Sequence, residues 1–352
     1  MVIIRPVQLK DLEALLHLSS QTSFGLTTLP HDKDLLRQRI RDSLHAFAKV
    51  KEKPRGEAFL FVMEDLKTRK VVGTTGIVSK VGGFEPFYAY RIEKEIHVSE
   101  TLEIRKEIPY LHLVSEHNGP SEIGSLFLSP EYRGGGNGRL LSLCRFIFMA
   151  EHKKFFDASV LAEMRGSIDD KGGSPFWNAL GRHFFGIDFP KADYLSLKDK
   201  KIIADLMPRH PIYIPLLPKT AQAVIGKVHA HSAPALKLLE GEGFARNGMI
   251  DVFEAGPLVS CAMEDIRTVR DSQEMLVAKI TKGKLDSHLY ILATLSPNFR
   301  ASSGHLAIIP GKGVEIEGEI AKALKLKVDD KIRIAPLFPL QEEIKISKKR
   351  AG

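Results

Sequence analysis

The sequence lacks several features that would place the protein outside the cytoplasm. Of its 352 residues only Cys144 and Cys261 are cysteine, and their wide separation is not the spacing of a metal-binding pair. So few thiols indicate a reducing compartment and no disulfide framework. The N-terminus shows no basic segment followed by an apolar run and a cleavage site, so we expect no signal peptide. The predicted location is the cytoplasm.

Long apolar runs and nucleic-acid-binding patterns are also missing. The longest apolar stretch, around 140–150, is interrupted by Ser142 and Arg145 and is far shorter than the roughly 20 residues of a membrane-spanning helix. The net charge is +8, but basic residues cluster only at 345–350, without a basic stripe that carries interleaved aromatic residues. We therefore expect no membrane span and no nucleic-acid partner, although the positive charge favours a phosphate-rich ligand.

The hydrophobic pattern predicts a mixed α/β protein. The 43% hydrophobic content is enough for a substantial core. The expected order is a strand, two helices, antiparallel strands, a further strand, a glycine-rich loop, a long helix and another strand. The predicted elements are helices from about Leu9 and Lys33, a hairpin of Glu57–Glu64 with Val71–Lys80, strands at Tyr110–Val114, Glu122–Leu128 and Ala158–Met164, and helices at Arg139–Lys154 and Pro175–Arg182.

Beyond about Cys261 the pattern changes to short strands separated by Gly, Asp and Asn turns. We divide the chain on this basis into residues 1–200, residues 201–260 and a small β-rich C-terminal region of residues 261–352. The aromatic segment Phe84–Arg91 is interpreted as a loop that either walls a pocket or caps a core. The elements expected in the C-terminal region are strands at Met275–Ile280, Ser287–Leu295, Leu306–Ile309 and Lys331–Ile334, and a helix near Glu319–Leu324.

A glycine-rich loop lies between the predicted strand Glu122–Leu128 and the helix from Arg139. Glycines let the backbone approach a diphosphate closely, and the free N–H groups at the start of the helix favour its negative charge. The loop lacks the Lys-Ser/Thr end of an NTPase loop, so nucleotide hydrolysis is not expected. Taken alone, the cluster is also compatible with a simple surface turn. The predicted phosphate cradle consists of Arg133, Gly134, Gly135, Gly136, Asn137 and Gly138.

The position of this loop resembles a known acyl-CoA site. Arg133, Gly136 and Gly138 are similar to the Arg/Gln-x-x-Gly-x-Gly/Ala signature with which GNAT acyltransferases hold the pyrophosphate of coenzyme A. Further along, the segment Ala235–Phe244 resembles the second GNAT signature, a helix and the strand after it, with Leu239 where tyrosine is frequent. The resemblance implies a GNAT-like acyl-CoA N-acyltransferase fold, and it gives no tyrosine general acid.

Longer segments resemble the arginine N-succinyltransferase family from end to end. That family transfers succinyl from succinyl-CoA to the α-amino group of L-arginine, in arginine catabolism. The resemblance thus implies succinyl-CoA as co-substrate, L-arginine as acceptor, no tightly bound cofactor and no metal. It also implies association, as a homo-oligomer or with a related subunit. The segments that carry the resemblance are Gly25–Pro30, Ala162–Gly166, Ser174–Trp177, Leu206–Tyr213 and Val224–His229.

The same resemblance implies two functional residues. His229 matches the proton-donating histidine of the family, and the register Val-His-x-x-Ser-Ala-Pro favours it over His231. Leu126 matches a succinyl-CoA contact on the strand before the glycine loop. Both roles are chemically sensible, because an α-ammonium group must lose a proton before it attacks a thioester and histidine titrates in the right range. A backbone N–H near Leu126 can stabilise the oxyanion that forms.

Other polar residues are left open as ligands of the acceptor. Glu122, Glu163, Asp251 and Glu254 are possible partners for a guanidinium group, and Arg165 or Arg91 for a carboxylate, although each is equally readable as a structural ion pair. Cys144 is expected in the core and not as a nucleophile, so direct transfer is preferred to an acyl-enzyme.

Two alternatives to arginine succinylation remain open at this stage. The same fold could acylate another amine such as ornithine or use acetyl-CoA, or the chain could be a non-catalytic, acyl-CoA-binding regulatory paralogue. The loop also departs from the family pattern, because Gly134 and Gly135 stand where the family carries charged or polar residues.

Overall fold

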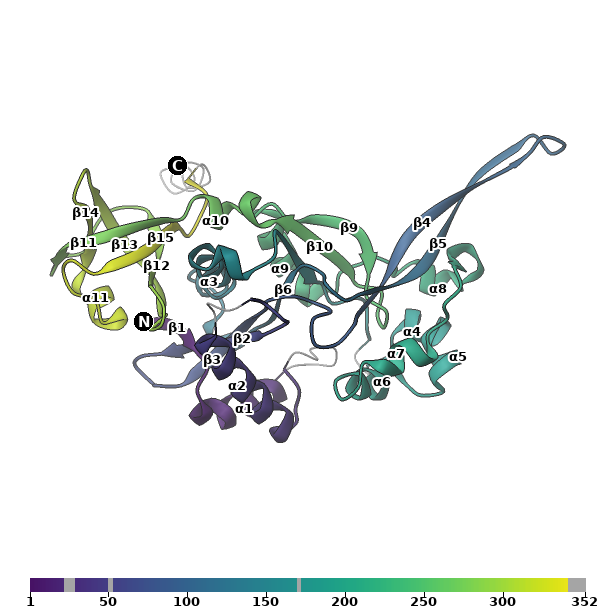
Figure 1. Cartoon of the computed structure of the whole chain (residues 1–352), viewed down its shortest axis with the longest axis horizontal. Helices are drawn as coiled ribbons and strands as arrows, with labels where there is room; N and C mark the ends of the chain where they lie inside the picture. The colour runs from purple at the N-terminus through teal and green to yellow at the C-terminus, as the bar shows by residue number, and fades with distance from the viewer. Residues whose placement is uncertain (22–28, 50–52, 170–171, 341–352) are drawn as a thin grey trace.

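A computed structural model describes residues 1–21, 29–49, 53–169 and 172–340 of the chain. In this part a single succession of fifteen hydrogen-bonded strands runs through the molecule, in the order β12-β15-β11-β14-β13-β1-β2-β3-β6-β7-β10-β9-β4-β5-β8. The molecule is elongated, with a β-rich unit at one end and a projecting hairpin at the other (Figure 1). Most of the segment Gly25–Pro30 and the basic tail 345–350 lie outside the described residues.

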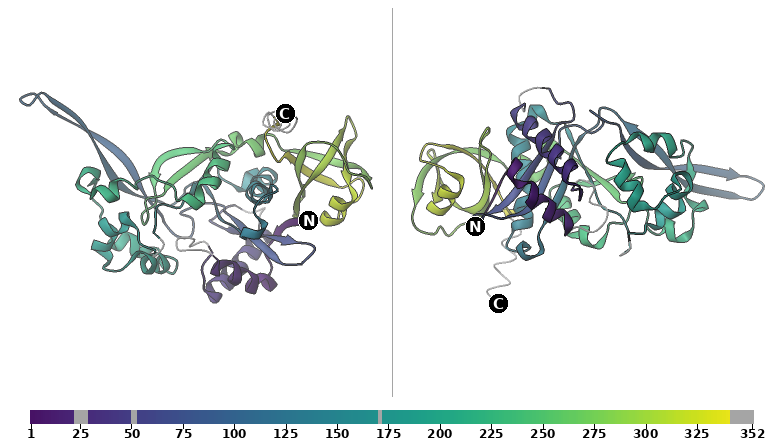
Figure 2. Two further views of the ribbon diagram at one scale, coloured as in Figure 1. Left: turned by 180° about the vertical axis from the view of Figure 1, so that it is seen from behind. Right: turned by 90° about the horizontal axis from the view of Figure 1, so that it is seen from below.

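The N-terminal part of the sheet is covered by helices on both faces. Residues of β2 alternate between two cores: Phe59, Phe61 and Met63 pack with α3, whereas Leu60 and Val62 pack with α1 and α2. Since side chains alternate along a strand, α1 and α2 lie on one face of the sheet and α3 on the other, as Figure 2 also shows. The elements of this part are β1 (Val2–Pro6), α1 (Leu12–Ser20), α2 (Lys33–Ala48), β2 (Ala58–Asp65), β3 (Val71–Val78), β6 (Ser121–Leu128) and α3 (Asn137–Glu151).

The middle of the sheet continues through β7, which runs parallel to β6, and then through antiparallel neighbours. A group of short helices packs beside it around the fully buried Trp177, whose indole N–H donates to Ile187 O at 3.0 Å. The elements are β7 (Ser159–Glu163), α4 (Pro175–Ala179), α5 (Gly181–Phe185), α6 (Phe189–Ser196), α7 (Lys201–Leu206), β8 (Ile212–Tyr213), α8 (Lys219–Gln222), α9 (Ala233–Glu240), β9 (Ala245–Ile250) and β10 (Pro257–Ala262).

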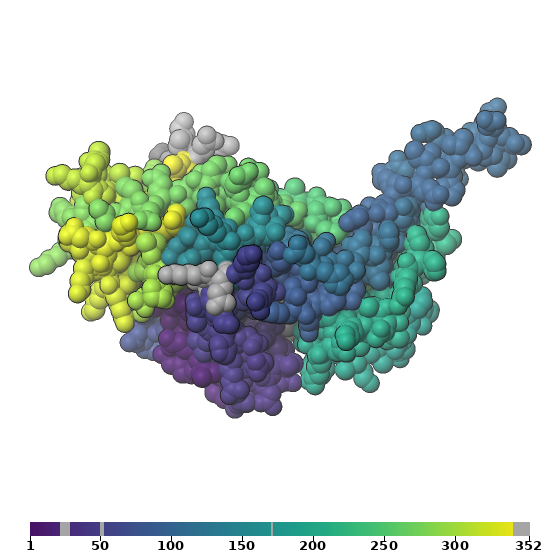
Figure 3. Space-filling view, in the orientation of Figure 1, coloured from purple at the N-terminus to yellow at the C-terminus, as the bar shows by residue number. Residues whose placement is uncertain are grey.

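A long hairpin of β4 (Phe87–Ser99) and β5 (Ile104–Glu116) extends from the body of the protein (Figure 3). Its strands pair continuously from Phe87 with Glu116 to Ser99 with Ile104. The interpretation of Phe84–Arg91 as a loop is therefore wrong, because most of it forms the buried base of β4. The sequence pattern did not indicate a strand here because the pairing partner, β5, lies further along the chain. In addition, the outer half of the hairpin buries little apolar surface.

The C-terminal region folds into a small closed barrel. Its strands pair in the order β12-β15-β11-β14-β13, and β13 pairs again with β12, which closes the ring. β13 also meets β1, and the buried Arg267 binds both Glu242 and Pro336 O, so the barrel is tied to the rest of the chain. Its elements are α10 (Arg267–Arg270), β11 (Gln273–Thr281), β12 (Leu289–Thr294), β13 (Ala301–Ile309), β14 (Gly313–Glu317), α11 (Gly318–Leu324) and β15 (Lys331–Pro336).

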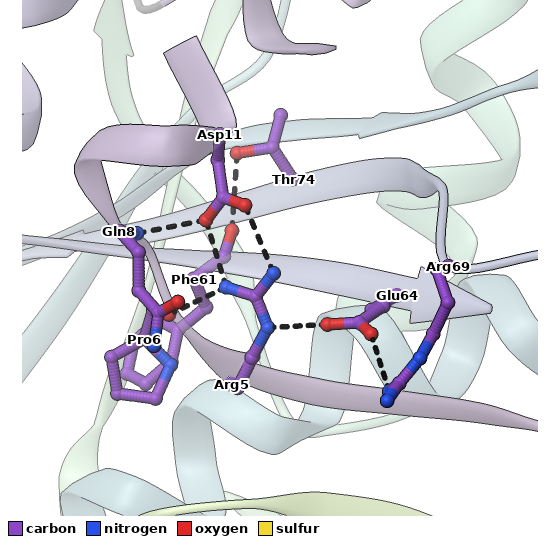
Figure 4. A network of polar contacts seen from close by, with 8 residues as sticks. All are labelled: Arg5, Pro6, Gln8, Asp11, Phe61, Glu64, Arg69 and Thr74. Atoms are coloured by element: carbon purple, nitrogen blue, oxygen red, sulfur yellow. Dashed lines mark hydrogen bonds and ion pairs between the residues drawn. The ribbon is translucent and has the colours of Figure 1, made fainter. Parts of the chain in front are cut away.

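A buried ion network fixes the start of the chain to the sheet (Figure 4). Arg5 on β1 donates from two nitrogens to Asp11, at 2.7 and 2.9 Å, and from Nε to Glu64 at 2.7 Å. Arg69 reaches the second oxygen of Glu64 at 3.2 Å. Burial alone would lower the pKa of Arg5, but the hydrogen bonds to Asp11 and Glu64 outweigh it and raise that pKa. Arg5 is thus paired with Asp11 and Glu64, and Arg69 is paired with Glu64.

The local predictions from sequence hold for the predicted β2–β3 hairpin, for β6, α3 and β7, and for the β-rich nature of the C-terminal region. The division into residues 1–200, 201–260 and 261–352 stays a prediction. In the described part of the chain, no helix combines the length and the apolar character needed to cross a membrane.

Candidate active site

Two irregularities of β6 open the sheet next to Leu126. Thr74 of β3 pairs with Phe127 and Gly76 pairs with Gly124, so β6 carries one extra residue between them, a β-bulge. Ser125 in this bulge has φ of 52°, a left-handed value that is rare outside glycine. On its other side β6 pairs with β7 only at Ser121 and Glu122. Leu126 therefore lies on the stretch of β6 beyond its pairing with β7.

The glycine-rich loop follows directly and ends at the start of α3. Gly134, Gly135 and Gly136 all have positive φ, at 110°, 57° and 84°, which explains why three consecutive glycines are needed. A Cβ added to Gly134 or Gly135 would meet no atom within 4 Å, so this surface is open. Among the described residues the N–H groups of Gly135 and Gly136 have no protein acceptor. Open backbone donors at a helix N-terminus are suited to bind a phosphate group.

Side chains next to the glycines hold the shape of this loop. Arg133 donates from Nε to Leu128 O at 3.1 Å, and Asn137 donates from its amide to Tyr132 O at 3.0 Å. The C-terminal region closes one side, since a Cβ on Gly136 would lie 3.2 Å from Leu337. All six predicted residues from Arg133 to Gly138 therefore lie in one structural unit, and Arg133 and Asn137 serve its geometry through these contacts.

His229 is anchored beside the end of β7. Its N–H donates to Arg165 O at 2.8 Å, two residues after β7 ends at Glu163. Its ring Nδ1 accepts the N–H of His231 at 3.2 Å, which fixes Nδ1 as the acceptor nitrogen in this arrangement. The side chain of His229 is partly exposed. Because β7 is the parallel neighbour of β6, this anchor brings His229 to the same strand pair as Leu126.

Two glycines allow the backbone turns around this anchor to meet. A Cβ on Gly166 would lie 2.2 Å from Glu254 O, and one on Gly256 would lie 1.9 Å from Met164 O. No side chain fits at such distances, so Gly166 and Gly256 are fixed by close packing. The N–H of Gly166 donates to Glu254 Oε1 at 2.7 Å. The close approach of the Glu254 carbonyl oxygen, which leaves no room for a Cβ, explains why the segment Ala162–Gly166 ends in glycine.

Five carboxyl groups gather around this turn, and we call them the acidic cluster. Desolvation by burial is the largest cause that raises the pKa of each. The pKa of Asp193 rises to about 7 and that of Glu254 to about 8. The side chain of Glu163 is exposed to solvent, and those of Glu122, Asp193 and Asp251 are partly exposed. The members are Glu122 on β6, Glu163 on β7, Asp193 on α6, and Asp251 and Glu254 in the turn between β9 and β10.

The structure shows which of the polar residues considered as acceptor ligands lie near one another. It brings Glu122, Glu163, Asp251 and Glu254 together, and it adds Asp193, which lies between Ala192 and Tyr194 with no sequence pattern to mark it. Arg165 belongs to the same region, since Glu254 and Asp193 act on its charge. Arg91 instead lies exposed on β4, 3.8 Å from Glu93.

The two cysteines lie in the described part of the chain, and neither is placed as a nucleophile. Cys144 is fully buried on α3, and burial raises the pKa of its thiol to about 12, so it is a core residue as predicted. Burial also raises the pKa of Cys261. Within the described ranges, no group of three or more His, Cys, Asp or Glu side chains is arranged to hold a metal ion.

Comparisons with known proteins agree with this architecture. A family model described as arginine N-succinyltransferase beta subunit matches residues 2–268. An arginine N-succinyltransferase of Yersinia pestis (strain Pestoides F) is 40% identical over 348 residues, covering 96% of this chain and 98% of the relative. An arginine N-succinyltransferase subunit beta of Pseudomonas aeruginosa is 41% identical over 347 residues, with coverage of 96% and 98%.

A solved structure shares the fold over nearly the whole chain. It is described as arginine/ornithine succinyltransferase subunit AI from Pseudomonas aeruginosa, and it matches with a TM-score of 0.88 and 32% identity over 96% of this chain and 99% of its own. The predicted mixed α/β fold is confirmed by this match to a succinyltransferase structure. The resemblance found in the sequence is likewise confirmed: the chain belongs to the arginine N-succinyltransferase family.

Proposed function

We propose that this protein transfers the succinyl group of succinyl-CoA to the α-amino group of L-arginine. The observation that carries the proposal is similarity at about 40% identity along 96% of the chain to proteins named arginine N-succinyltransferase. The glycine loop, the bulged strand and the anchored His229 support it, because a non-catalytic paralogue would need only the loop.

The glycine loop is the proposed site for the pyrophosphate of coenzyme A. The open N–H groups of Gly135 and Gly136 and the N-terminus of α3 supply donors and a positive dipole end. From there the thioester end of the co-substrate reaches the stretch of β6 beyond its pairing with β7. The backbone near Leu126 is free of a β7 partner and can donate to the thioester oxygen as it becomes an oxyanion.

His229 is the proposed general base and acid. It takes a proton from the α-ammonium group at Nδ1, which gives up its bond to the N–H of His231 as the acceptor binds, and the freed amine attacks the thioester carbon to form the new C–N bond. The tetrahedral intermediate then loses the second proton of its nitrogen to solvent and breaks its C–S bond, and the proton returned by His229 neutralises the departing CoA thiolate. The high pKa of the buried Cys144 thiol argues against an acyl-enzyme, so both substrates react in one ternary complex.

One further acceptor is supported by a specific observation. The solved structure that matches nearly the whole chain is described as an arginine/ornithine succinyltransferase, so ornithine is the second acceptor to consider.

We further propose a cytoplasmic location. We also propose assembly with itself or with a related subunit, which the subunit names of the Pseudomonas aeruginosa proteins support.

The experiment that tests the proposal measures free-thiol release by the purified protein. Succinyl-CoA or acetyl-CoA is supplied with arginine, ornithine, lysine or no amine. We expect release only with succinyl-CoA, with arginine giving the highest kcat/KM. If CoA binds but no pair releases thiol, the chain is a regulatory acyl-CoA-binding paralogue and the proposal is wrong.

A further inference from the structure

Glu254 is the member of the acidic cluster whose position is hardest to explain as purely structural. Its side chain is only 7% exposed. One carboxyl oxygen accepts the Gly166 N–H at 2.7 Å, whereas Oε2 is buried and has no hydrogen-bond partner among the described residues. A buried carboxyl oxygen without a donor costs free energy. A ligand that brings a donor with positive charge would remove that cost.

The surroundings of Glu254 add further negative charge. The charges of Asp251 and Asp193 act on Glu254, and Glu163 is in turn influenced by Glu122, Asp251 and Glu254. Asp193 lies on α6 and Glu122 on β6, so the carboxyl groups converge from four separate parts of the fold.

Basic side chains compensate this charge only in part. Arg165 acts on Glu254 and Asp193, while Lys200 at the start of α7 acts on Glu122 and Glu163. Arg39 of α2 acts on Glu122. The interactions resolved for the cluster thus set five carboxyl groups against three basic groups. With every group ionised, the balance in this region is negative, so a cationic ligand is favoured.

The location of the cluster connects it with the proposed chemistry. Gly166, which holds Glu254, follows directly after Arg165, whose carbonyl group holds the backbone of His229. Glu122 lies on β6 with Leu126, and it lines a cavity together with Arg39 and Ser125 of the bulge. Glu254 and the backbone of His229 are thus held by neighbouring residues of one turn.

We propose that the acidic cluster binds the cationic side-chain end of the amino-acid acceptor, with Glu254 and Glu163 as direct partners, and releases protons as the cation enters. This inference rests on the proposed function for the identity of the acceptor, which carries a guanidinium or ammonium group. A guanidinium group can donate two parallel hydrogen bonds to a carboxylate, and this match favours arginine. Proton release follows because a nearby positive charge favours the ionised form of each carboxyl group.

The first test is steady-state kinetics of Glu254→Gln and Glu163→Gln. Glutamine keeps the shape of Glu254 and the acceptor oxygen for Gly166. We expect the KM for arginine to rise about tenfold or more in each variant, with the KM for succinyl-CoA unchanged, as for loss of one charge-assisted hydrogen bond. The matched control is Glu151→Gln, since Glu151 also has a raised pKa and accepts one backbone N–H, from Ser296 at 2.6 Å, but lies on α3 away from the cluster.

The second test uses L-citrulline, which replaces the guanidinium group with a neutral urea of the same shape. Wild-type protein should prefer arginine to citrulline, and both cluster variants should lose most of that preference. Calorimetry in two buffers of different ionisation enthalpy should show proton release near pH 7 on arginine binding, less release in Glu254→Gln, and none with citrulline.

The outcomes separate this inference from the proposed function. If wild-type protein succinylates arginine while both variants keep the wild-type KM, the function stands and the role of the cluster is wrong. If no thiol is released with arginine, the proposed function fails, but calorimetry still decides the inference: arginine binding with proton release supports it, and no binding or proton-neutral binding overturns it. Should Glu254→Gln fail to fold, the solvent-accessible Glu163→Gln carries the same test.

Discussion

Two groups of charged residues in this protein differ in how their charges are balanced. In the network of Arg5, Asp11 and Glu64, the guanidinium group donates to both carboxylates at 2.7 to 2.9 Å (Figure 4). In the acidic cluster, Glu254 keeps a buried oxygen without a protein donor. The first group joins β1 to β2, whereas the second lies beside the anchor of His229.

The difference teaches how to distinguish structural charge from functional charge. A network whose charges are matched within the protein has no need of a ligand, so its loss should appear as lost stability. A cluster whose carboxyl groups have raised pKa values is costly for the folded protein to keep ionised, and its benefit should appear when a substrate binds. Variants of the two regions should therefore affect different measurements.

The largest expected effect concerns the structural network. Arg5→Leu leaves Asp11 and Glu64 buried without their cation, and we expect the free energy of unfolding to fall by about 3–5 kcal/mol. Urea denaturation measures this loss. The control is Arg69→Ala, because the Arg69 side chain is 74% exposed and its ion pair with Glu64 should contribute less than about 1 kcal/mol. Equal losses in the two variants would contradict the view of Arg5 as the centre of the network.

The next largest effect tests catalysis beside the acidic cluster. His229→Ala should lower kcat by about a hundredfold or more, because general acid-base help is lost, while succinyl-CoA still binds. The control is His231→Ala, which removes the neighbouring ring but leaves the His229 anchor to Arg165 in place. Rapid-quench turnover and calorimetric CoA binding separate the two steps. A full-rate His229→Ala together with an inactive His231→Ala would move the role to His231.

A smaller effect is expected on the cofactor side. Gly135→Ala places a side chain at φ of 57°, which costs about 1–2 kcal/mol in a left-handed conformation although no atom blocks it. We expect the KM for succinyl-CoA to rise by up to about tenfold and the KM for arginine to stay constant. Gly138→Ala is the control, because Gly138 lies within α3 at negative φ and alanine suits a helix. Similar effects of both changes would argue against a role for the loop conformation.

The last prediction is a dependence of stability on pH to which the acidic cluster should contribute. Glu254 and Asp193, with pKa values raised to about 8 and 7 from usual values of 4.5 and 3.8, hold protons in the folded protein that the unfolded chain has released. The free energy of unfolding should thus fall as pH rises from about 4 to 8. Thermal unfolding of the ligand-free protein measures this slope, and Glu254→Gln should flatten it. An unchanged slope in that variant would remove Glu254 as its source.

Much of the fold could be predicted because its signals are local. The β2–β3 hairpin shows two apolar runs around a polar turn, and the glycine loop shows its spacing directly. The helix expected at Pro175–Arg182 is instead two helices that break at Leu180, where a Cβ on Gly181 would lie 2.2 Å from the Trp177 ring. That contact brings together residues whose local sequence gives no sign of it. Closure of the C-terminal barrel was unpredictable for the same reason.

The sequence by itself determined the family, and it supplied the predictions of a phosphate cradle from Arg133 to Gly138 and of His229 as the proton-transfer residue, since each depends on residues close together in the chain. Only the tertiary structure decided that Asp193, Glu163 and Glu254 meet around one turn. Their pKa values and unsatisfied charge arise from burial and from neighbours many residues away, and no local pattern records those distances.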